Sequence, residues 1–219
     1  MSRLQAPTKL RDLGVSPGLA EDLFSRRVLA ERTSTIGRVA EALCVSHTVA
    51  NEIAASLREK ALLEYQGLDG RDYRITLTEL GFRTTAERMK SAQHVASMPV
   101  PIEDYQTIVK LQQKEVHLDR VLVKKAFSDM VVEDSVLDQI GPAFVSGGAI
   151  FIYGPPGTGK TSLAERMSRF YDDLVLIPRF AAVDGELISV FDPSLHRPVA
   201  EQSPGLDPRY VLCERPLIM

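Results

Sequence analysis

The first ninety residues alternate between helix-like and strand-like hydrophobic patterns. Ser16-Pro17 is typical of a helix start, and apolar residues then recur at helical spacing over 19–28. A second, short helix is predicted over 36–43, and a third begins at Ser46 after a tight break. Two helices joined by about three residues have the spacing of a helix-turn-helix.

The pattern changes to period two in the stretch LLEYQGLDGRDYRITL. Apolar residues alternate on both sides of Asp69-Gly70, a dipeptide that favours a tight hairpin turn. Thr78 can then cap a closing helix. This order of elements resembles a small winged helix-turn-helix domain of α+β type over 15–92, preceded by an N-terminal tail at 1–14.

A small, polar, proline-bearing stretch interrupts the pattern at 93–101. Pro99 and Pro101 favour extended backbone in their neighbours. We therefore predict a linker there and a second domain over 102–219.

Apolar runs without alternation mark the strands expected in the second domain. Residues 149–153 and 174–178 have the pattern of parallel strands buried on both faces. A helix is predicted after Thr161, and Asp184-Gly185 predicts a further hairpin. Helices alternating with such strands indicate an α/β fold with a partial doubly wound sheet.

Composition excludes several classes of protein. The chain has 219 residues, of which 44% are hydrophobic and 25% are charged, so it is not a disordered protein. No apolar stretch approaches the roughly 20 residues of a membrane span, and the first residues lack a signal-peptide core. We expect a cytoplasmic protein without a membrane partner. Cys44 and Cys213 form no C-x-x-C pair, so neither a disulfide framework nor a zinc site is expected.

The net charge of −3 is unevenly distributed. Residues 1–95 carry 14 Lys and Arg against 12 Asp and Glu, whereas residues 96–219 carry 12 against 17. Nucleic-acid-binding proteins normally concentrate basic side chains on one face. The near-balance in the first half therefore weakens the case for DNA binding.

The most specific motif is GPPGTGKT at 154–161, which fits the P-loop (Walker A) template G-x-x-x-x-G-K-[ST]. Its glycines allow turn conformations that direct backbone N–H groups at phosphate oxygens at a helix N-terminus. Lys160 would reach the β and γ phosphates, and the Thr161 hydroxyl would bind Mg²⁺. The candidate ATP-binding residues are Gly154, Pro155, Pro156, Gly157, Thr158, Gly159, Lys160, Thr161 and Ser162.

The stretch AFSDMVV, a helix and an apolar run leading into GPPGTGKT together resemble the nucleotide-binding domain of AAA+ ATPases. The resemblance implies an α/β P-loop NTPase with ATP and Mg²⁺ as cofactors. It also implies that an adenine pocket includes Ser128, Asp129, Met130 and Val131. Ordinary core packing of Phe127 and Val131 accounts for the same pattern, so both interpretations stay open. The guanine-specifying motif N-K-x-D is absent from the sequence, which favours adenine.

Hydrolysis needs an acidic residue at the end of another strand to hold the metal's water shell. Asp192 is not assigned this role, because Ser189 breaks its apolar run and Pro193 follows where a second acid usually stands. No sensor, arginine-finger or lid segment follows. We therefore expect the front part of a longer ATPase, in which this chain binds ATP and the full-length form hydrolyses it.

The winged-helix resemblance leaves two functions open, because function does not follow from fold. In DNA-binding members of this class, the start of the recognition helix and the hairpin, which is called the wing, reach the DNA. Here the recognition helix is the one that begins at Ser46, and the wing is the hairpin around Asp69-Gly70. The corresponding residues are Ser46, His47, Thr48, Asn51, Arg71 and Arg74. However, residues 46–60 have no net charge, and Asp69 and Asp72 accompany the wing arginines. One alternative is an ATPase whose nucleotide state is coupled to a protein partner or to further copies in a ring. The other is a nucleotide-gated DNA-binding transcriptional regulator.

Overall fold

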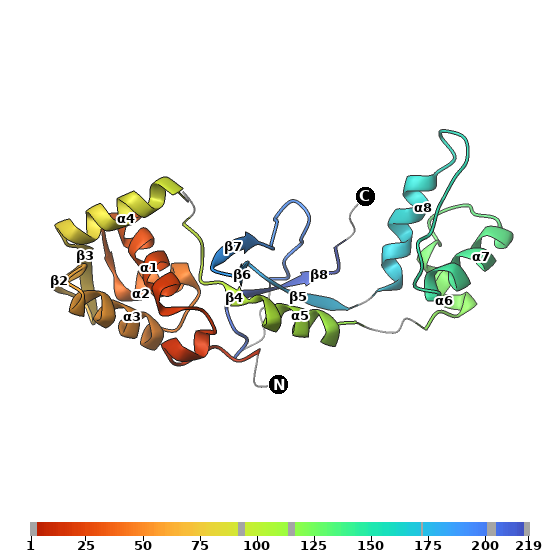
Figure 1. The fold of residues 1–219 in the computed structure, drawn as a ribbon. Helices are drawn as coiled ribbons and strands as arrows, with labels where there is room; N and C mark the ends of the chain where they lie inside the picture. The colour runs from red at the N-terminus through yellow and green to blue at the C-terminus, as the bar shows by residue number, and fades with distance from the viewer. Residues whose placement is uncertain (1–3, 92–94, 114–116, 172, 201–204, 217–219) are drawn as a thin grey trace.

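The computed structural model is a mixed α/β fold built from three modules, and the chain passes through the middle one twice (Figure 1). The N-terminal module comprises residues 15–91, the β module comprises 95–113, 173–200 and 205–216, and the P-loop lobe comprises 117–171. Figure 1 shows the N-terminal module at the left, the β module in the middle and the P-loop lobe at the right. The structure describes residues 4–91, 95–113, 117–171, 173–200 and 205–216.

The N-terminal module has the winged-helix-like arrangement expected from its pattern. Its three strands form an antiparallel sheet in the order β1-β3-β2, against which the helices pack. After a short 3-10 helix, η2 (Leu10–Leu13), its elements are α1 (Pro17–Glu31), β1 (Thr33–Thr35), α2 (Ile36–Leu43), α3 (His47–Glu59), β2 (Leu63–Asp69), β3 (Asp72–Leu77) and α4 (Glu79–Ser91).

Side-chain caps set the helix boundaries of this module. The hydroxyl oxygens of Ser16, Thr35 and Ser46 each accept the backbone N–H of the third residue further on, at the starts of α1, α2 and α3. Cys44 ends α2 in the left-handed conformation, with φ 56°. Gly70, with φ 64°, closes the hairpin between β2 and β3. The capping and turn positions predicted from the sequence are therefore confirmed.

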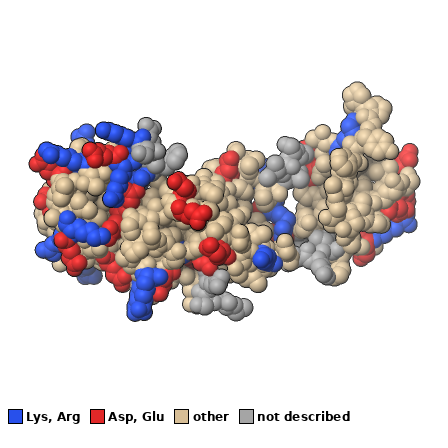
Figure 2. All heavy atoms as spheres, viewed as in Figure 1, with Lys and Arg blue, Asp and Glu red and all other residues tan. Residues whose placement is uncertain are grey.

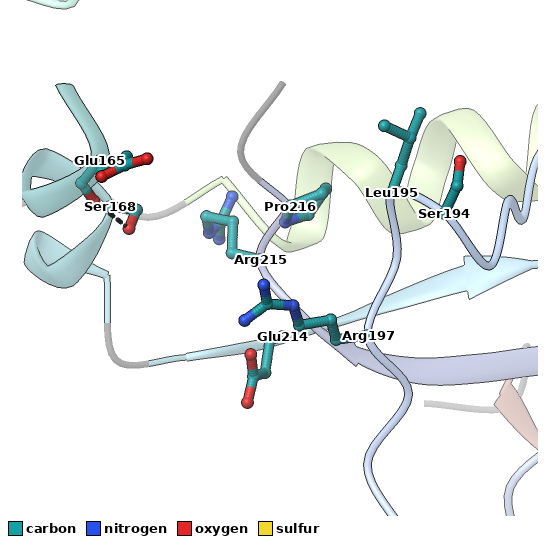
Figure 3. A pocket seen from close by; sticks show the side chains of 8 residues that line it. All are labelled: Glu165, Ser168, Ser194, Leu195, Arg197, Glu214, Arg215 and Pro216. Atoms are coloured by element: carbon teal, nitrogen blue, oxygen red, sulfur yellow. Dashed lines mark hydrogen bonds between the residues drawn. The ribbon is translucent and has the colours of Figure 1, made fainter. Parts of the chain in front are cut away.

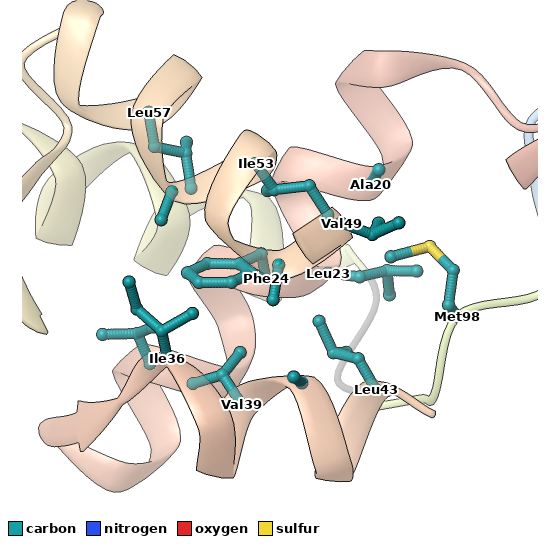
Figure 4. Packing of buried hydrophobic residues seen from close by; sticks show 14 of the residues in the cluster. Ala20, Leu23, Phe24, Ile36, Val39, Leu43, Val49, Ile53, Leu57 and Met98 are labelled. Atoms are coloured by element: carbon teal, nitrogen blue, oxygen red, sulfur yellow. The ribbon is translucent and has the colours of Figure 1, made fainter. Parts of the chain in front are cut away.

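A continuous apolar core fills the space between the helices of this module (Figure 4). Phe24 of α1 is fully buried among side chains from α2 and α3, including Ile36, Leu43 and Ile53. Met98 enters this core from the predicted linker, and its N–H donates to the Leu43 carbonyl at 2.9 Å.

Most of the described part of the predicted linker is packed rather than exposed, although Val95 is exposed. Ala96, Met98 and Val100 are all buried. Residues 93 and 94 of that prediction lie outside the described residues. The segment therefore joins the N-terminal module to the β module through buried apolar contacts.

The β module contains two small sheets and one helix. Strand β4 (Val100–Pro101) pairs in parallel with β6 (Phe180–Val183), which forms an antiparallel hairpin with β7 (Glu186–Ser189). Strand β5 (Leu174–Pro178) pairs antiparallel with β8 (Tyr210–Glu214). Helix α5 (Ile102–Leu111) follows β4 directly. The predicted turn at Asp184-Gly185 is confirmed, since both residues have positive φ in the β6–β7 hairpin.

The P-loop lobe is a small helical unit with its own core. Its elements are α6 (Arg120–Ala126), α7 (Asp134–Val145), α8 (Lys160–Met167) and the 3-10 helix η3 (Ser168–Phe170). The Phe170 ring contacts the rings of Phe127 and Phe144, at centroid distances of 5.9 and 4.8 Å. Within the described part of the chain, no helix combines the length and the apolar content that crossing a bilayer needs.

The described residues of the second half do not form the predicted doubly wound sheet. Residues 149–153 are not in a strand, and Phe151 and Tyr153 are 86% and 93% exposed. Residues 174–178 do form a strand, β5, but it pairs antiparallel with β8 and lies in the β module rather than in the P-loop lobe. A strand buried on both faces needs parallel neighbours and helices to cover it. The described residues give 149–153 neither, so the prediction of a buried parallel strand there is wrong.

Candidate functional site

The GPPGTGKT loop is shaped by three glycines at positive φ. Gly154 has φ 151°, Gly157 has φ 80° and Gly159 has φ 78°. These conformations are costly for residues with a Cβ atom, so glycine is required for this turn. The last of the three is the N-cap of α8, which puts the loop directly at the start of a helix.

Lys160 is folded back onto the loop. Its Nζ donates to the carbonyl oxygens of Gly154 at 3.0 Å and Pro155 at 2.6 Å, and lies 3.4 Å from Thr158 Oγ1. All of these acceptors are neutral, and the described residues place no carboxylate in an ion pair with this ammonium. A positive charge therefore lies within the loop without an anionic partner.

The start of α8 adds unbonded backbone donors. No side chain caps this end, and the first helical bond runs from Leu163 N–H to the Gly159 carbonyl at 2.8 Å. The N–H groups of Lys160, Thr161 and Ser162 have no carbonyl partner within the described residues. The positive end of the helix dipole lies at the same place. These features together suit an anion with several oxygen atoms.

The structure brings one residue of the 128–131 segment, Met130, next to this loop. A Cβ atom placed on Gly159 would lie 3.7 Å from Met130 Cε. Phe127 is only 2% exposed and belongs to the core of the lobe, whereas Val131 is fully exposed. The core interpretation therefore holds for Phe127 but not for Val131.

Asp129 of this segment is held by two arginines that the sequence analysis did not single out. Arg169 and Arg166 both donate to its carboxylate. The hydrogen bonds from Arg169, and then those from Arg166, hold the pKa of Asp129 far below its ordinary range. The sequence offered one signal for this contact, which is the spacing of Arg166 and Arg169. Residues three apart in the helix after the P-loop lie on the same face and can bind one carboxylate together.

The described residues do not gather a set of candidate metal ligands at the loop. Among the described residues, no group of three or more His, Cys, Asp or Glu side chains could hold a metal ion. Asp192, which the sequence analysis set aside, caps a turn in the β module instead. Its Oδ1 accepts from the backbone N–H and the hydroxyl of Ser194, at 2.8 and 2.7 Å.

A cavity of 390 Å³ lies at the opposite end of α8 from the loop, between that helix and β8 (Figure 3). Glu165 and Ser168 face it from one side, and Arg197 and Arg215 face it from the other. Arg215 is already paired with Asp173 at 2.8 Å. This cavity mixes both signs of charge and does not include the GPPGTGKT loop.

The proposed DNA-contacting residues of the N-terminal module are mostly bonded within the module. Asp72 on the wing accepts the Gly37 N–H at 2.7 Å and lies 3.2 Å from His47 Nε2, while Asn51 Nδ2 lies 2.7 Å from His47 Nδ1. Burial raises the pKa of Asp72, but the hydrogen bonds from Gly37 and His47 outweigh this and hold the pKa below its ordinary value. Arg74 pairs with Asp69 at 3.3 Å.

The start of α3 is also covered by the N-terminal segment. Ser46 donates its hydroxyl to the Pro7 carbonyl at 3.3 Å, and the Leu10 N–H donates to Glu52 at 2.7 Å. Thr48 and Arg71 make no side-chain hydrogen bond or ion pair with other described residues. Figure 2 shows Lys and Arg interspersed with Asp and Glu over the visible face of this module. The basic face typical of DNA-binding proteins is not present in that view.

Comparison with known proteins gives little further guidance. No family model matches the chain, and no curated protein matches it. Two solved structures of ZitR from Lactococcus lactis, both of mutant forms, are similar over part of the chain. The first, a mutant in apo form, is 19% identical over 59% of this chain and 83% of that chain, with a TM-score of 0.31. The second mutant is 18% identical over 58% of this chain and 70% of that chain, also with a TM-score of 0.31. Scores this low assign neither fold nor function.

Proposed function

We propose that this chain binds Mg-ATP at the GPPGTGKT loop, as a P-loop NTPase of the AAA+ type. The observation that carries the proposal is the position of Lys160. Its ammonium is bonded only to neutral acceptors of the loop and lies beside the uncapped start of α8. A triphosphate would offer anionic oxygens to the same ammonium and to the unbonded N–H groups, and charged hydrogen bonds are about twice as strong as neutral ones.

The Thr161 hydroxyl is the protein's contribution to the magnesium site in this proposal. Mg²⁺ keeps several waters and binds phosphate oxygens, so one hydroxyl next to the phosphates is a sufficient protein ligand for binding. The bound metal would neutralise phosphate charge. The proposal concerns binding rather than turnover, because Asp192 is engaged in a turn of the β module.

The base is assigned to the 128–131 segment. Met130 lies against Gly159, and its polarisable thioether suits contact with an aromatic ring. Val131 offers a fully exposed apolar side chain one residue further on. An adenine placed there would cover apolar surface that is otherwise in water.

The N-terminal module is assigned to a protein partner or to a second copy of the chain. His47 and Asn51 are bonded to each other, and Asp72 adds a carboxylate where DNA would bring phosphates. A carboxylate at that place opposes DNA binding through charge repulsion. The alternative is a nucleotide-gated DNA-binding regulator. In that case Thr48 and Arg71 are the side chains that would contact DNA.

Replacing Lys160 tests the nucleotide site. Lys160→Ala is expected to weaken Mg-ATP binding by about 100-fold, since a charged hydrogen-bonding group that faces the phosphates is lost. Lys125→Ala is the matched control, because it removes an exposed lysine of α6 in the same lobe. Binding of fluorescent ATP measures both. Equal affinities for the wild-type chain and Lys160→Ala would overturn the proposal.

A further inference from the structure

We propose that Asp129 is a positioning residue for the nucleotide base, which it serves by fixing the 128–131 segment to the helix that starts at the phosphate site. The inference rests on the proposed ATP site and adds a residue outside the P-loop on which base binding depends. Its partners are Arg166 on α8 and Arg169 on η3.

Both oxygens of the Asp129 carboxylate are used. Arg169 binds in a bidentate manner, with Nη1 at 2.7 Å from Oδ1 and Nη2 at 3.0 Å from Oδ2. Arg166 adds Nη2 at 3.0 Å from Oδ2, and its Nε lies 3.4 Å from Oδ1. Bidentate guanidinium pairing fixes direction as well as distance. The carboxylate is therefore held in one orientation.

The two arginines also bind backbone on both sides of the contact. Arg166 Nη1 donates to the Ser162 carbonyl at 3.2 Å, in the first turn of α8. Arg169 Nη1 donates to the Ala126 carbonyl at 2.8 Å, at the end of α6. The contact therefore connects the segment after α6 to the helix whose first residue is Lys160.

The next residue after Asp129 reaches the P-loop itself. Met130 Cε lies within van der Waals distance of a Cβ placed on Gly159, whereas Val131 is fully exposed. Core packing of Phe127 precedes the segment and fixes its start. Asp129 is thus the last fixed polar contact before Met130 and Val131, the two side chains that would contact the base.

The cluster is partly exposed. The side chains of Asp129 and Arg169 are 42% and 47% exposed, and that of Arg166 is 22% exposed. Water and salt screen exposed ion pairs, but bidentate geometry and a second arginine strengthen this one. Removing the carboxylate should therefore change the direction of the segment and also reduce the stability of the lobe, and only the first effect distinguishes ATP from a ligand without a base.

Comparison of two ligands on an Asp129→Asn variant of the full chain tests the inference. The ligands are Mg-ATP and inorganic tripolyphosphate with Mg²⁺, which share the phosphate contacts but not the base. We expect ATP affinity to fall by about tenfold and tripolyphosphate affinity to stay within about twofold of wild type. Asp138→Asn is the control, because Asp138 forms an exposed ion pair with Arg120 at 2.9 Å elsewhere in the lobe.

Two further variants keep the test decisive if Asp129→Asn folds poorly. Asp129→Glu retains the charge and is expected to recover most of the ATP affinity, and Arg169→Gln is expected to reproduce the selective loss. Unchanged ATP affinity in Asp129→Asn, or equal losses for both ligands, overturns the positioning role alone. If the wild-type chain binds neither ligand, the proposed ATP site fails, and the inference fails with it.

Discussion

In the N-terminal module, two single carboxylates link elements that the apolar core also holds together. Asp72 joins the wing to the starts of α2 and α3 through Gly37 and His47. Glu21 of α1 accepts from Lys60 Nζ at 2.6 Å and from Ser56 Oγ at 2.7 Å, at the end of α3. Hydrogen bonds to charged groups are the stronger class. Polar contacts therefore help to fix how α1, α3 and the wing meet.

Glu21→Gln is expected to destabilise the fold at neutral pH but not in acid. Burial raises the pKa of Glu21, but the hydrogen bonds from Lys60 and Ser56 outweigh it and hold the pKa below the ordinary 4.5. A carboxylate with a lowered pKa stabilises the fold above its unfolded-state pKa, and that stability is lost as pH falls through the folded-state value. Because Lys60 is half exposed, we expect a loss of only about 1 kcal/mol at neutral pH.

Urea denaturation of the wild-type chain and the Glu21→Gln variant measures this difference in free energy of unfolding. The difference should shrink toward zero in acid, below the folded-state pKa of Glu21, where the carboxyl is protonated in both the folded and the unfolded state. An equal difference at both pH values would show that the charge of Glu21 is not what stabilises the contact.

At the level of elements, the surface of α3 decides between a protein partner and DNA. This helix has the position of a recognition helix, yet the N-terminal segment is bonded to it. Its N-cap Ser46 donates a hydrogen bond to the Pro7 carbonyl, and its Glu52 accepts one from the Leu10 N–H. The wing beside it carries Asp69 and Asp72 with its arginines. This surface has little excess positive charge to offer phosphates.

Titration of DNA at several salt concentrations separates the two proposed partners. We expect only weak binding to duplex DNA, and replacing Arg71 and Arg74 together by Ala should change it by less than about twofold. Fluorescence anisotropy with a labelled duplex measures the affinity. Tight binding that weakens steeply with salt and is lost in the Arg71→Ala, Arg74→Ala variant would favour the DNA-binding regulator instead.

Elements with local signals could be predicted from the sequence, and elements that depend on distant partners could not. The caps at Ser16 and Ser46 and the turn at Asp184-Gly185 follow from neighbouring residues alone. The strand predicted at 149–153 needed parallel neighbours, and these are not supplied by the described residues. Arg166 and Arg169 gave no clear signal, because their contact with Asp129 spans about forty positions of chain.

At the level of the whole molecule, a buried arginine of the β module, Arg209, reaches the backbone of Leu13 just before the N-terminal module. Arg209 and Asp207 are 4% and 0% exposed and pair at 2.8 Å. Arg209 Nη1 also donates to the carbonyls of Leu13 and Pro99, both at 2.9 Å. Removing one member of such a pair leaves an uncompensated buried charge. Met98 adds the shared apolar core, so these two modules form one unit.

The P-loop lobe is built differently, because its core around Phe127 and Phe170 is separate from the other two. Its described contact with the β module includes Arg215, which pairs with Asp173 and lies 4.5 Å over the Tyr171 ring. A ligand that binds between α8 and the 128–131 segment would therefore stabilise the P-loop lobe directly, since the lobe has its own core.

Calorimetric titration of the wild-type chain with Mg-ATP tests the central claim most directly. We predict saturable binding of one nucleotide per chain, with a Kd of about 1–100 μM, and displacement by inorganic tripolyphosphate through the shared phosphate contacts. A titration without saturable heat, or binding that tripolyphosphate does not displace, would contradict the claim that Lys160 and the start of α8 form a phosphate site.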